Sequence, residues 1–586
     1  MRKTRSNSLA DVKVKTDLVS AARSGASMTG CGFNAAVNGT ANPSSHRGGT
    51  LVFDNSGDWD STDPGNSYVA YAWNFARLYT RTLTTYSAKA GSGAEELVPD
   101  LARDLGEVSP DRRTWTYRLK PNLRMEDGEL ITSYMIKHAV ERSASYSDTL
   151  PIGPVYWRTF LASFGDSGED TSGTGEQVGI STPDPLTIVF HLRRPMAEFD
   201  HLVSMPQTAP VPPAKDTGTE YYRHPLSSGP YMFDHYVTGK QLTLVRNPQW
   251  DPSTDPARKQ LVDKIVVNLN VDADEIDERL FTGRSHLAVE GGGVQHRGQA
   301  RIMASPALRS NADNPTNGFV WYAAINTVIP PLDNVHCRRA VLYAADHVAL
   351  QEAFGGSAGG EIVSTMLPQT IPGAPPETFD PYGFHSKPRG DLKKAAAALA
   401  EGGCPDGFAT AISFRNNRPK EQAAAEALRD SLARVGIKAD LLGYPSGEID
   451  VYPGTPAFVH ENNLGINITG WGSDWPSGFG FLHAICHGDA ILPTSNSNIS
   501  ELNDPLVNAL LDVVMTIESA TERHDIYRRV AERITEQAAF LPIVHSRSLV
   551  FRNPDVTNVR VSSALQMHDY AVMGLRPASK TDETTR

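Results

Sequence analysis

Alternating hydrophobic and polar positions recur along the first half of the chain, and this period of two is typical of strands with one buried face. Trp115 and Tyr117, for example, alternate with polar neighbours. A helix is expected next, because Thr132 or Ser133 can serve as its N-cap before an apolar-periodic run that reaches about Arg142. The same reasoning predicts strands at residues 51–53, 186–195 and 262–271, and a hairpin over residues 227–250 that turns near Gly239.

From about residue 317 the pattern changes to alternating strands and helices. Leu428, Leu432 and Val435 recur at helical spacing before the stop signal Gly436, and Asp346 can cap another helix. Strands are expected at residues 319–326, 437–443 and 540–551, and helices within residues 334–356, 391–403, 419–436, 504–519 and 521–539. A β-rich first half followed by a βαβ second half predicts an α/β protein with two lobes.

Composition supports a globular protein and excludes some functions. The 586 residues are 40% hydrophobic and 21% charged, which is enough for a large core in two or three domains. A formal net charge of -12 without a dense basic block argues against a nucleic-acid surface. No run of about 18 apolar residues is present, so we expect no membrane-spanning helix.

The N-terminal segment allows more than one interpretation. "MRKTR" is typical of the basic start of a signal peptide, and "SMTGCGF" is similar to a lipobox with Cys31 as the lipidated residue. The segment between them contains Asp11, Lys13 and Asp17, whereas a signal peptide needs about 7–15 apolar residues there. A degenerate signal, a disordered tail and a protein exported by another route all remain open. The polar residues after Cys31 are typical of a linker.

The stretch "GWGSDWPSG", Gly470 to Gly478, is the strongest candidate for chemistry. Asp474 lies between Trp471 and Trp475, although a carboxylate near buried aromatic rings normally requires a partner. One interpretation is local: Asp474 caps a turn or pairs with an internal arginine, and both tryptophans belong to the core. The other is that the missing cation belongs to a ligand.

Enzymatic and metal sites have weaker support. "GGSAG" surrounds Ser357 with a hydrolase-like spacing, but we expect a helix before it and a strand after it, the reverse of a nucleophile elbow. "HAICH" places His483 and His487 one helical turn apart beside Cys486, without an acidic third ligand at a suitable spacing. We therefore predict a protein that is not an enzyme and has no cofactor or metal. A bridge between any two of Cys337, Cys404 and Cys486 stays open.

Seven segments, in order, resemble solute-binding protein family 5 of ABC importers, which includes oligopeptide-, dipeptide- and nickel-binding proteins. They span roughly residues 48–560. The residue usage looks actinobacterial, and the chain also resembles oligopeptide-binding proteins of antibiotic clusters. The segments are "GGTLVFDNSGDWDSTDP", "LVPDLARDLGEVSPDRRTWTYRLKPNLRMEDGELITSYMIKHAVER", "SSGPYMFDHYVTGKQLTLVRNPQW", "VHCRRAVLYAADHVAL", "CPDGF", "GWGSDWPSGFGFL" and "RHDIYRRVAERITEQAAFLPIVH".

The resemblance implies a two-lobed periplasmic-binding-protein-like α/β fold of the class II type, with an extra small domain in the N-terminal half. The lobes would close on a ligand about a hinge. The expected divisions are a signal-like or linker segment at 1–47, lobe I at 48–82, 207–310 and 541–586, the small domain at 83–206, and lobe II at 311–540.

The resemblance also implies roles for individual residues. Asp474 would hold the α-amine of a peptide, and Gly470 and Gly472 would leave backbone groups free to pair with it. Trp471 and Trp475 would supply flat apolar walls. Asn326 and Ser228, or its neighbour Ser227, would be polar contacts, with strand-end and turn hydrogen bonding as the alternative. Ile468 departs from the pattern, because some tripeptide binders carry an arginine there that can meet a ligand carboxylate.

We therefore expect an extracytoplasmic substrate-binding protein of an ABC importer that captures oligopeptides or peptide-like solutes and passes them to permease subunits. It would be a monomer, either anchored to the membrane by lipid or periplasmic. Two alternatives remain. One is a binder of nickel chelates or other small solutes on the same scaffold, and the other is a binding protein that serves biosynthesis or sensing instead of transport.

Overall fold

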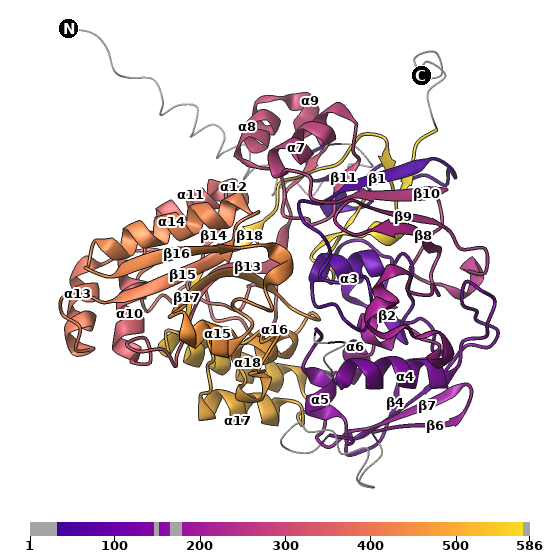
Figure 1. Ribbon diagram of the computed structural model, residues 1–586, viewed down its shortest axis with the longest axis horizontal. Helices are drawn as coiled ribbons and strands as arrows, with labels where there is room; N and C mark the ends of the chain where they lie inside the picture. Colours follow the sequence, from indigo (N-terminus) through magenta and orange to yellow (C-terminus); the bar gives the residue numbers. More distant parts are fainter. Residues whose placement is uncertain (1–31, 146–149, 151, 165–178, 578–586) are drawn as a thin grey trace.

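The structure, a computed structural model, describes residues 32–145, 150, 152–164 and 179–577 (Figure 1). Cys31, the predicted lipidation residue, lies outside the described residues, so its modification stays a prediction. Within the described ranges, no helix combines the length and the apolar character needed to cross a membrane.

A five-stranded mixed sheet forms the core of the first lobe. Its order is β11-β1-β10-β9-β8, with β1 parallel to β10 and β11 and the remaining pairs antiparallel. The side chain of Phe53 packs edge-on against the rings of Phe75 and Tyr570, which come from helix α3 and from the C-terminal part of the chain. The predicted hairpin turns at Gly239, where φ is +72°. The elements are β1 Thr50–Asp54, α3 Ala70–Ala76, β8 Tyr231–Val237, β9 Gln241–Arg246, β10 Lys264–Asn268 and β11 Leu287–Ala288.

A four-stranded antiparallel sheet, ordered β4-β5-β7-β6, forms a separate unit beside helix α4. Trp115 and Tyr117 are buried, as the alternation predicted. Helix α4 begins after Thr132, but the predicted cap is wrong: the Thr132 side chain makes no cap hydrogen bond, and the Ser133 hydroxyl group donates to the carbonyl oxygen of Asp184. The elements are β4 Glu107–Val108, β5 Thr114–Arg118, α4 Ser133–Ala144, β6 Ile180–Asp184 and β7 Thr187–His191.

A six-stranded sheet, ordered β14-β18-β13-β17-β15-β16, is the core of the second lobe. Strand β15 runs parallel to β16 and β17, whereas the other neighbouring strands are antiparallel. The strands are β13 Thr316–Ile325, β14 Gly360–Ile362, β15 Ala409–Arg415, β16 Lys438–Tyr444, β17 Ile466–Gly472 and β18 Phe540–Arg547.

Helices cover both faces of this sheet, so its central strand β13 is buried on both sides (Figure 1). Ala323 and Ile325 pack in the core cluster of the first helix group, whereas Tyr322 and Ala324 pack in the cluster of the second. This alternation follows from the strand period of two. The first group is α10 Val335–Ala344, α11 His347–Ala353, α13 Leu392–Glu401 and α14 Pro419–Ala433. The second is α16 Gly478–Cys486, α17 Pro505–Val514 and α18 Ala520–Glu536.

Local helix signals in the second lobe are confirmed. Asp346 caps α11 by accepting hydrogen bonds from the backbone N–H groups of Val348 and Ala349, both at 3.1 Å. Gly436 follows the end of α14 with φ at +85°, a conformation that glycine adopts at low cost.

Strand β18 shows that the expected boundary at residue 541, between the second lobe and the C-terminal part of the first lobe, is wrong. Because β18 pairs with β13 and β14, residues 541–547 lie in the six-stranded sheet and not with the first lobe. The chain returns to the first lobe afterwards, where Val556 and Tyr570 join the core cluster of β1. The other boundaries remain proposals.

Shorter elements connect the three sheets. The helices are α2 Ala35–Asn38, α5 Tyr156–Phe160, α6 Phe199–Leu202, α7 Ala273–Thr282, α8 His296–Ala304, α9 Pro306–Arg309, α12 Gly356–Gly359 and α15 Pro456–Glu461. The strands are β2 Thr84–Tyr86, β3 Leu97–Pro99, β12 Ala312–Asp313, β19 Val550–Phe551, β20 Val556–Thr557, β21 Val561–Ser562, β22 Met567–His568 and β23 Gly574–Leu575.

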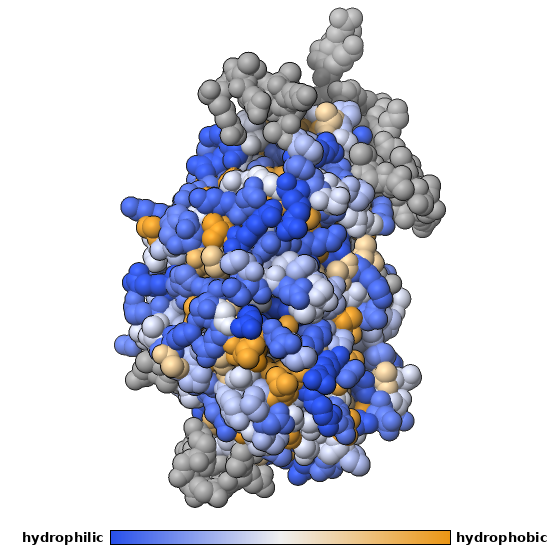
Figure 2. Space-filling model, turned by 90° about the vertical axis from the view of Figure 1, so that its right-hand side faces the viewer, coloured by the Kyte–Doolittle hydropathy of each residue, from blue (hydrophilic) through white to orange (hydrophobic). Residues whose placement is uncertain are grey.

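The six-stranded sheet with its helices forms one side of the molecule, and the other two sheets lie one above the other on the opposite side (Figure 1). The surface of that opposite side is largely hydrophilic, with hydrophobic groups dispersed among charged ones (Figure 2). The most exposed large apolar side chains of the N-terminal half come from separate positions: Leu105, Val108, Leu130, Tyr134 and Val237.

Candidate functional site

A cavity lies between the two lobes and encloses about 1960 Å³ of unfilled space, including its opening to solvent. Asp474, Trp471, Gly470 and Gly472, four of the predicted site residues, line it. One wall belongs to the first lobe and the small domain and is formed by parts of residues 60–86, 204–206, 290–292 and 564–567. The other wall belongs to the second lobe and is formed by parts of residues 317–322, 415–418, 449–454, 469–474 and 495–499.

The Asp474 carboxylate is held by two tyrosines, Tyr68 from the cavity lining and Tyr156 from the core behind it. Its Oδ2 atom accepts hydrogen bonds from the hydroxyl groups of Tyr68 at 2.7 Å and Tyr156 at 2.6 Å. The backbone N–H of Asp474 donates to the carbonyl oxygen of Gly480, which fixes the loop before α16. The half-buried carboxylate therefore has a defined position on the cavity wall.

Burial raises the pKa of Asp474 from 3.8 to about 7, and the hydrogen bonds from Tyr156 and Tyr68 offset only part of this effect. No lysine, arginine or histidine among the described residues forms an ion pair with this carboxylate. The local interpretation, in which an internal arginine neutralises Asp474, therefore has no support in the described part of the chain.

Trp471 and the two glycines shape the wall next to Asp474. The Trp471 ring lies edge-on to the Tyr68 ring, with centroids 6.0 Å apart, and its Nε1 donates to the carbonyl oxygen of Phe481. A Cβ atom on Gly470 would lie 2.1 Å from the Phe319 ring, and one on Gly472 would lie 2.1 Å from Gln566 Oε1. The glycines thus admit neighbouring side chains, a packing role that the sequence did not reveal.

Trp475 does not line the cavity, contrary to its expected role as a wall. Its side chain is 0% exposed, its ring packs against Tyr156 with centroids 4.8 Å apart, and its Nε1 donates to Glu198 at 2.6 Å. Glu198 also accepts hydrogen bonds from Ser477 and Tyr527. Trp475 therefore anchors the Asp474 loop in the core behind the cavity wall.

Asn326 and Ser228 also lie away from the cavity lining. Asn326, at the end of β13, donates to Glu501 at 2.7 Å and accepts from the backbone N–H groups of Val328 and Ile329. The Ser228 hydroxyl group accepts from the N–H of Arg81, and the neighbouring Ser227 is 0% exposed. Both predicted positions make the strand-end and turn hydrogen bonds that were the alternative interpretation.

Position 468 offers no cation to the cavity, whereas Arg418 does. Ile468 is fully buried in the helix-covered sheet. Arg418, at the start of α14, lines the cavity and has only long ion pairs, 3.7 Å to Glu290 and 3.9 Å to Glu421. Its neighbour Arg415 is bound more tightly to Glu421, at 2.5 Å.

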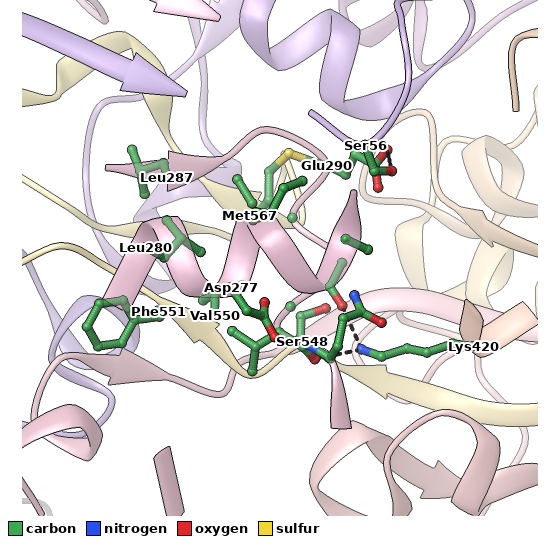
Figure 3. Close-up of a pocket in the computed structure, with 18 of the residues that line it drawn as sticks. Ser56, Asp277, Leu280, Leu287, Glu290, Lys420, Ser548, Val550, Phe551 and Met567 are labelled. Carbon is green, nitrogen blue, oxygen red and sulfur yellow. Dashed lines mark hydrogen bonds between the residues drawn. The ribbon is translucent and has the colours of Figure 1, made fainter. Parts of the chain in front are cut away.

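A second cavity, of about 1060 Å³, adjoins the first and shares Arg418 and Glu290 with it. Figure 3 shows this second cavity, with Glu290 and Lys420 among the residues that line it. Lys420 crosses from α14 and donates to the carbonyl oxygens of Gly292 and Val294, at 3.3 and 3.1 Å. Burial lowers the pKa of Lys420 to about 8 and raises that of Asp277 to about 7. These contacts join the two lobes next to the larger cavity.

The structure also shows the surroundings of the residues considered for a hydrolase site and for a metal site. Ser357 is exposed in α12 and is followed directly by β14, so its surroundings are the reverse of a nucleophile elbow. His483 and His487 stack in the core with ring centroids 4.8 Å apart, and burial lowers the pKa of His483 far below its usual range. The described residues contain no group of three or more His, Cys, Asp or Glu side chains placed to hold a metal.

The cysteines of the described residues, Cys337, Cys404 and Cys486, are free thiols. Burial, together with the neighbouring thiol of Cys404, raises the pKa of Cys337 to about 11.

Sequence reasoning missed the residues that complete the site. Tyr68 and Tyr156 are 406 and 318 positions away from Asp474, and no local motif connects them to it. Asp60, Arg418 and Asp450 also line the cavity without a motif of their own. The strand that contains Phe319 was predicted, but not that its ring forms part of the cavity wall.

Comparisons with known proteins agree on one family. The model of bacterial extracellular solute-binding proteins, family 5, matches residues 96–492. A structure described as clavulanic acid biosynthesis oligopeptide binding protein 2 is 41% identical, with a TM-score of 0.84 over 94% of this chain and 99% of the other. The periplasmic binding protein DppA from Helicobacter pylori, in complex with peptide STSA, has a TM-score of 0.74 at 21% identity, over 91% and 99% of the two chains.

Relatives compared by sequence are more distant. The glutathione-binding protein GsiB of Shigella dysenteriae is 23% identical over 79% of this chain and 85% of its own length. The heme-binding protein A of Haemophilus influenzae is 27% identical over 57% of this chain, and the match spans 56% of that protein.

Proposed function

The chain belongs to the bacterial extracellular solute-binding proteins of family 5, and we propose that it captures oligopeptides or peptide-like solutes between its lobes for delivery to an ABC permease. The relatives named for oligopeptide, peptide and glutathione binding support this ligand class. The two-lobed fold and the cavity between the lobes suit reversible capture.

The observation that carries the proposal is the Asp474 carboxylate, which faces the cavity without a cation among the described residues. A zwitterionic peptide brings an ammonium group into this half-buried place. The ammonium loses water on entry, and a carboxylate compensates this loss only when both groups are well hydrogen-bonded. Tyr68 and Tyr156 meet that condition on the protein side, because they hold Oδ2 and leave Oδ1 for the ligand.

The other end of the ligand is assigned to Arg418. This guanidinium lies on the same cavity, and its long ion pairs leave donors available for a carboxylate. Trp471 and Phe319 offer aromatic surface between the two ends, which accepts side chains of many shapes.

Thermal unfolding with matched peptides tests this function. Peptides of three to five residues with a free amine should raise the melting temperature, by an amount equivalent to about 2.7 kcal/mol at a hundredfold excess over Kd. Their N-acetylated counterparts should not, because they offer no ammonium group to Asp474. Equal stabilisation by both sets would remove the amine role, and mass spectrometry of co-purified solute would identify the natural ligand.

The proposal also includes the membrane anchor and the oligomeric state. A lipid anchor at Cys31 and a monomeric state are consistent with capture outside the cytoplasm, where family 5 proteins work. The similarity to a protein named for clavulanic acid biosynthesis supports one alternative, a binding role in biosynthesis. An amine-bearing biosynthetic intermediate among the co-purified solutes would favour that alternative over nutrient import.

A further inference from the structure

The small domain, which is the four-stranded sheet with α4, α5 and α6, contacts the second lobe through α5. The Trp157 ring stacks on Phe190 and so holds this helix on its own sheet. Tyr156 and Phe160, one helical turn apart, face α16 of the second lobe instead, with ring centroids 6.3 and 6.0 Å from that of Phe479 (Figure 1). The small domain and the second lobe thus share one apolar core.

The small domain is nevertheless attached to the first lobe. The chain connects these two units directly, and buried ion pairs join them: Asp63 with Arg142 at 2.8 Å, and Asp100 with Arg258 at 2.8 Å. Breaking a buried pair leaves an uncompensated charge, which is costly. The small domain is therefore expected to move with the first lobe, so its contact with the second lobe opens whenever the lobes part.

Glu198 is a carboxylate that the small domain presents at this contact. It directly precedes α6, in which Phe199 packs against the rings of Trp115 and Phe190 with centroids 5.6 and 5.1 Å apart. The side chain of Glu198 is only 8% exposed. The four-stranded sheet thus fixes the position of Glu198, although the residue lies at the edge of the domain.

Four groups of the second lobe surround the Glu198 carboxylate. Its Oε2 atom accepts hydrogen bonds from Trp475 Nε1 and the Ser477 hydroxyl group, both at 2.6 Å. Its Oε1 atom accepts from the Tyr527 hydroxyl group at 3.1 Å, and Arg523 Nε lies 3.7 Å away. Separation of the small domain from the second lobe would break all of these contacts at once.

The contact acts on the ligand site from behind. Trp475 and Ser477 belong to the loop that carries Asp474, whereas Glu198 does not line the main cavity. A separate cavity of about 740 Å³, including its opening to solvent, lies at Glu198 between the small domain and the second lobe. Among the described residues it shares no lining residue with the main cavity, so the ligand need not touch Glu198 for this carboxylate to matter.

We propose that the small domain is a clasp for the closed arrangement, and that Glu198 is its positioning residue. Docked on the second lobe, Glu198 fixes the loop of Trp475 and Ser477, and through it Asp474, and it holds a share of the ligand-free molecules closed. The inference rests on the proposed function, because the loop that it positions carries the carboxylate assigned to the ligand.

The substitution Glu198→Gln tests the clasp, because the amide keeps the shape of the side chain but turns an N–H group toward groups that are themselves donors. Small-angle scattering of the ligand-free variant should give a larger radius of gyration than the wild type. Saturation with a free-amine peptide of three to five residues should restore the wild-type value, which a loosened fold would not do. In stopped-flow measurements the peptide should dissociate about ten times faster, without a fall in its association rate.

A second variant and a control accompany this substitution. Tyr527→Phe removes one hydrogen bond to Glu198 and keeps the ring, so it tests the same contact should Glu198→Gln fold poorly. The effects of the two changes on dissociation should not add, because they remove a shared contact. Glu107→Gln is the matched control: Glu107 is exposed and pairs with Arg118 inside the small domain, so scattering and dissociation should stay unchanged.

An unchanged radius of gyration in both Glu198→Gln and Tyr527→Phe would overturn the clasp, even if affinity fell, because Glu198 would then be a static support of the loop. The proposed function would still stand in that case. Failure of every peptide to bind the wild type would overturn the proposed function, and the scattering of the ligand-free proteins would still decide whether the clasp exists.

Discussion

The substitution Asp474→Asn separates a ligand-binding carboxylate from a structural one. The amide keeps the size of the side chain and one acceptor for the hydroxyl groups of Tyr68 and Tyr156. It removes the negative charge, which no cation of the described residues balances. Ligand binding should therefore suffer while the fold does not.

The expected loss of affinity follows from the environment of the carboxylate. Breaking a buried ion pair by removal of one partner costs about 3–5 kcal/mol. The half-buried position of Asp474 favours the lower end, and 3 kcal/mol corresponds to roughly 10²-fold in Kd.

The raised pKa of Asp474 should also make ligand affinity depend on pH. Because the pKa is raised to about 7, the carboxyl group of the free protein is neutral in acid, so affinity for a free-amine peptide should fall as the pH drops below 7. At pH 5 about 1% of the group is ionised, which corresponds to a loss of up to about 100-fold. The Asp474→Asn protein should show little of this dependence.

The stability of the ligand-free protein should depend on pH in the opposite way to its ligand affinity. A carboxyl group with a raised pKa binds more protons folded than unfolded between pH 3.8 and about 7, so its contribution to the free energy of unfolding becomes less favourable as the pH rises through this window. The ligand-free Asp474→Asn protein should thus melt at the same or a higher temperature than the wild type at pH 8.

Calorimetric titrations at pH 5, 7 and 8, with melting curves of the ligand-free proteins, measure both effects. Asp406→Asn, an exposed change outside the cavity, is the control for the general effect of charge. A change in affinity below threefold, or a clear fall in the melting temperature without ligand, would show that Asp474 serves the fold and that the reasoning is wrong.

Two further substitutions test the cavity wall. Arg418→Gln should weaken the binding of peptides with a free C-terminal carboxylate about tenfold and leave the binding of peptide amides unchanged, because only the free carboxylate needs the guanidinium. Calorimetry measures both affinities, and an equal loss for the two kinds of peptide would exclude that contact. Gly470→Ala should lower the free energy of unfolding by about 1–3 kcal/mol, since the added Cβ overlaps the Phe319 ring. Denaturant titration measures this cost, and Gly447→Ala, where no atom lies within 4 Å of the added Cβ, should be neutral; equal effects of the two would contradict the packing argument.

Several features followed from local sequence because their causes are local. The period of two in β5 reflects side chains that alternate across a strand, and the cap at Asp346 involves N–H groups two and three residues away. The glycine-rich segment around Asp474 likewise indicated a carboxylate in an aromatic environment, and the structure places it on the cavity wall.

The tertiary structure decided which of these residues face the cavity. Trp471 and Trp475 are equivalent in the sequence, but the strand carries one to the cavity wall while Glu198, 277 positions away, holds the other in the core. Tyr68 and Asp474 belong to different lobes, and nothing near either residue in the sequence indicates the other. Periodicity encodes which face of an element is buried, whereas the pairing of charges depends on how distant elements pack together. The sequence by itself thus determined the elements and the family resemblance, and only the packing of the two lobes decided which charges remain for a ligand.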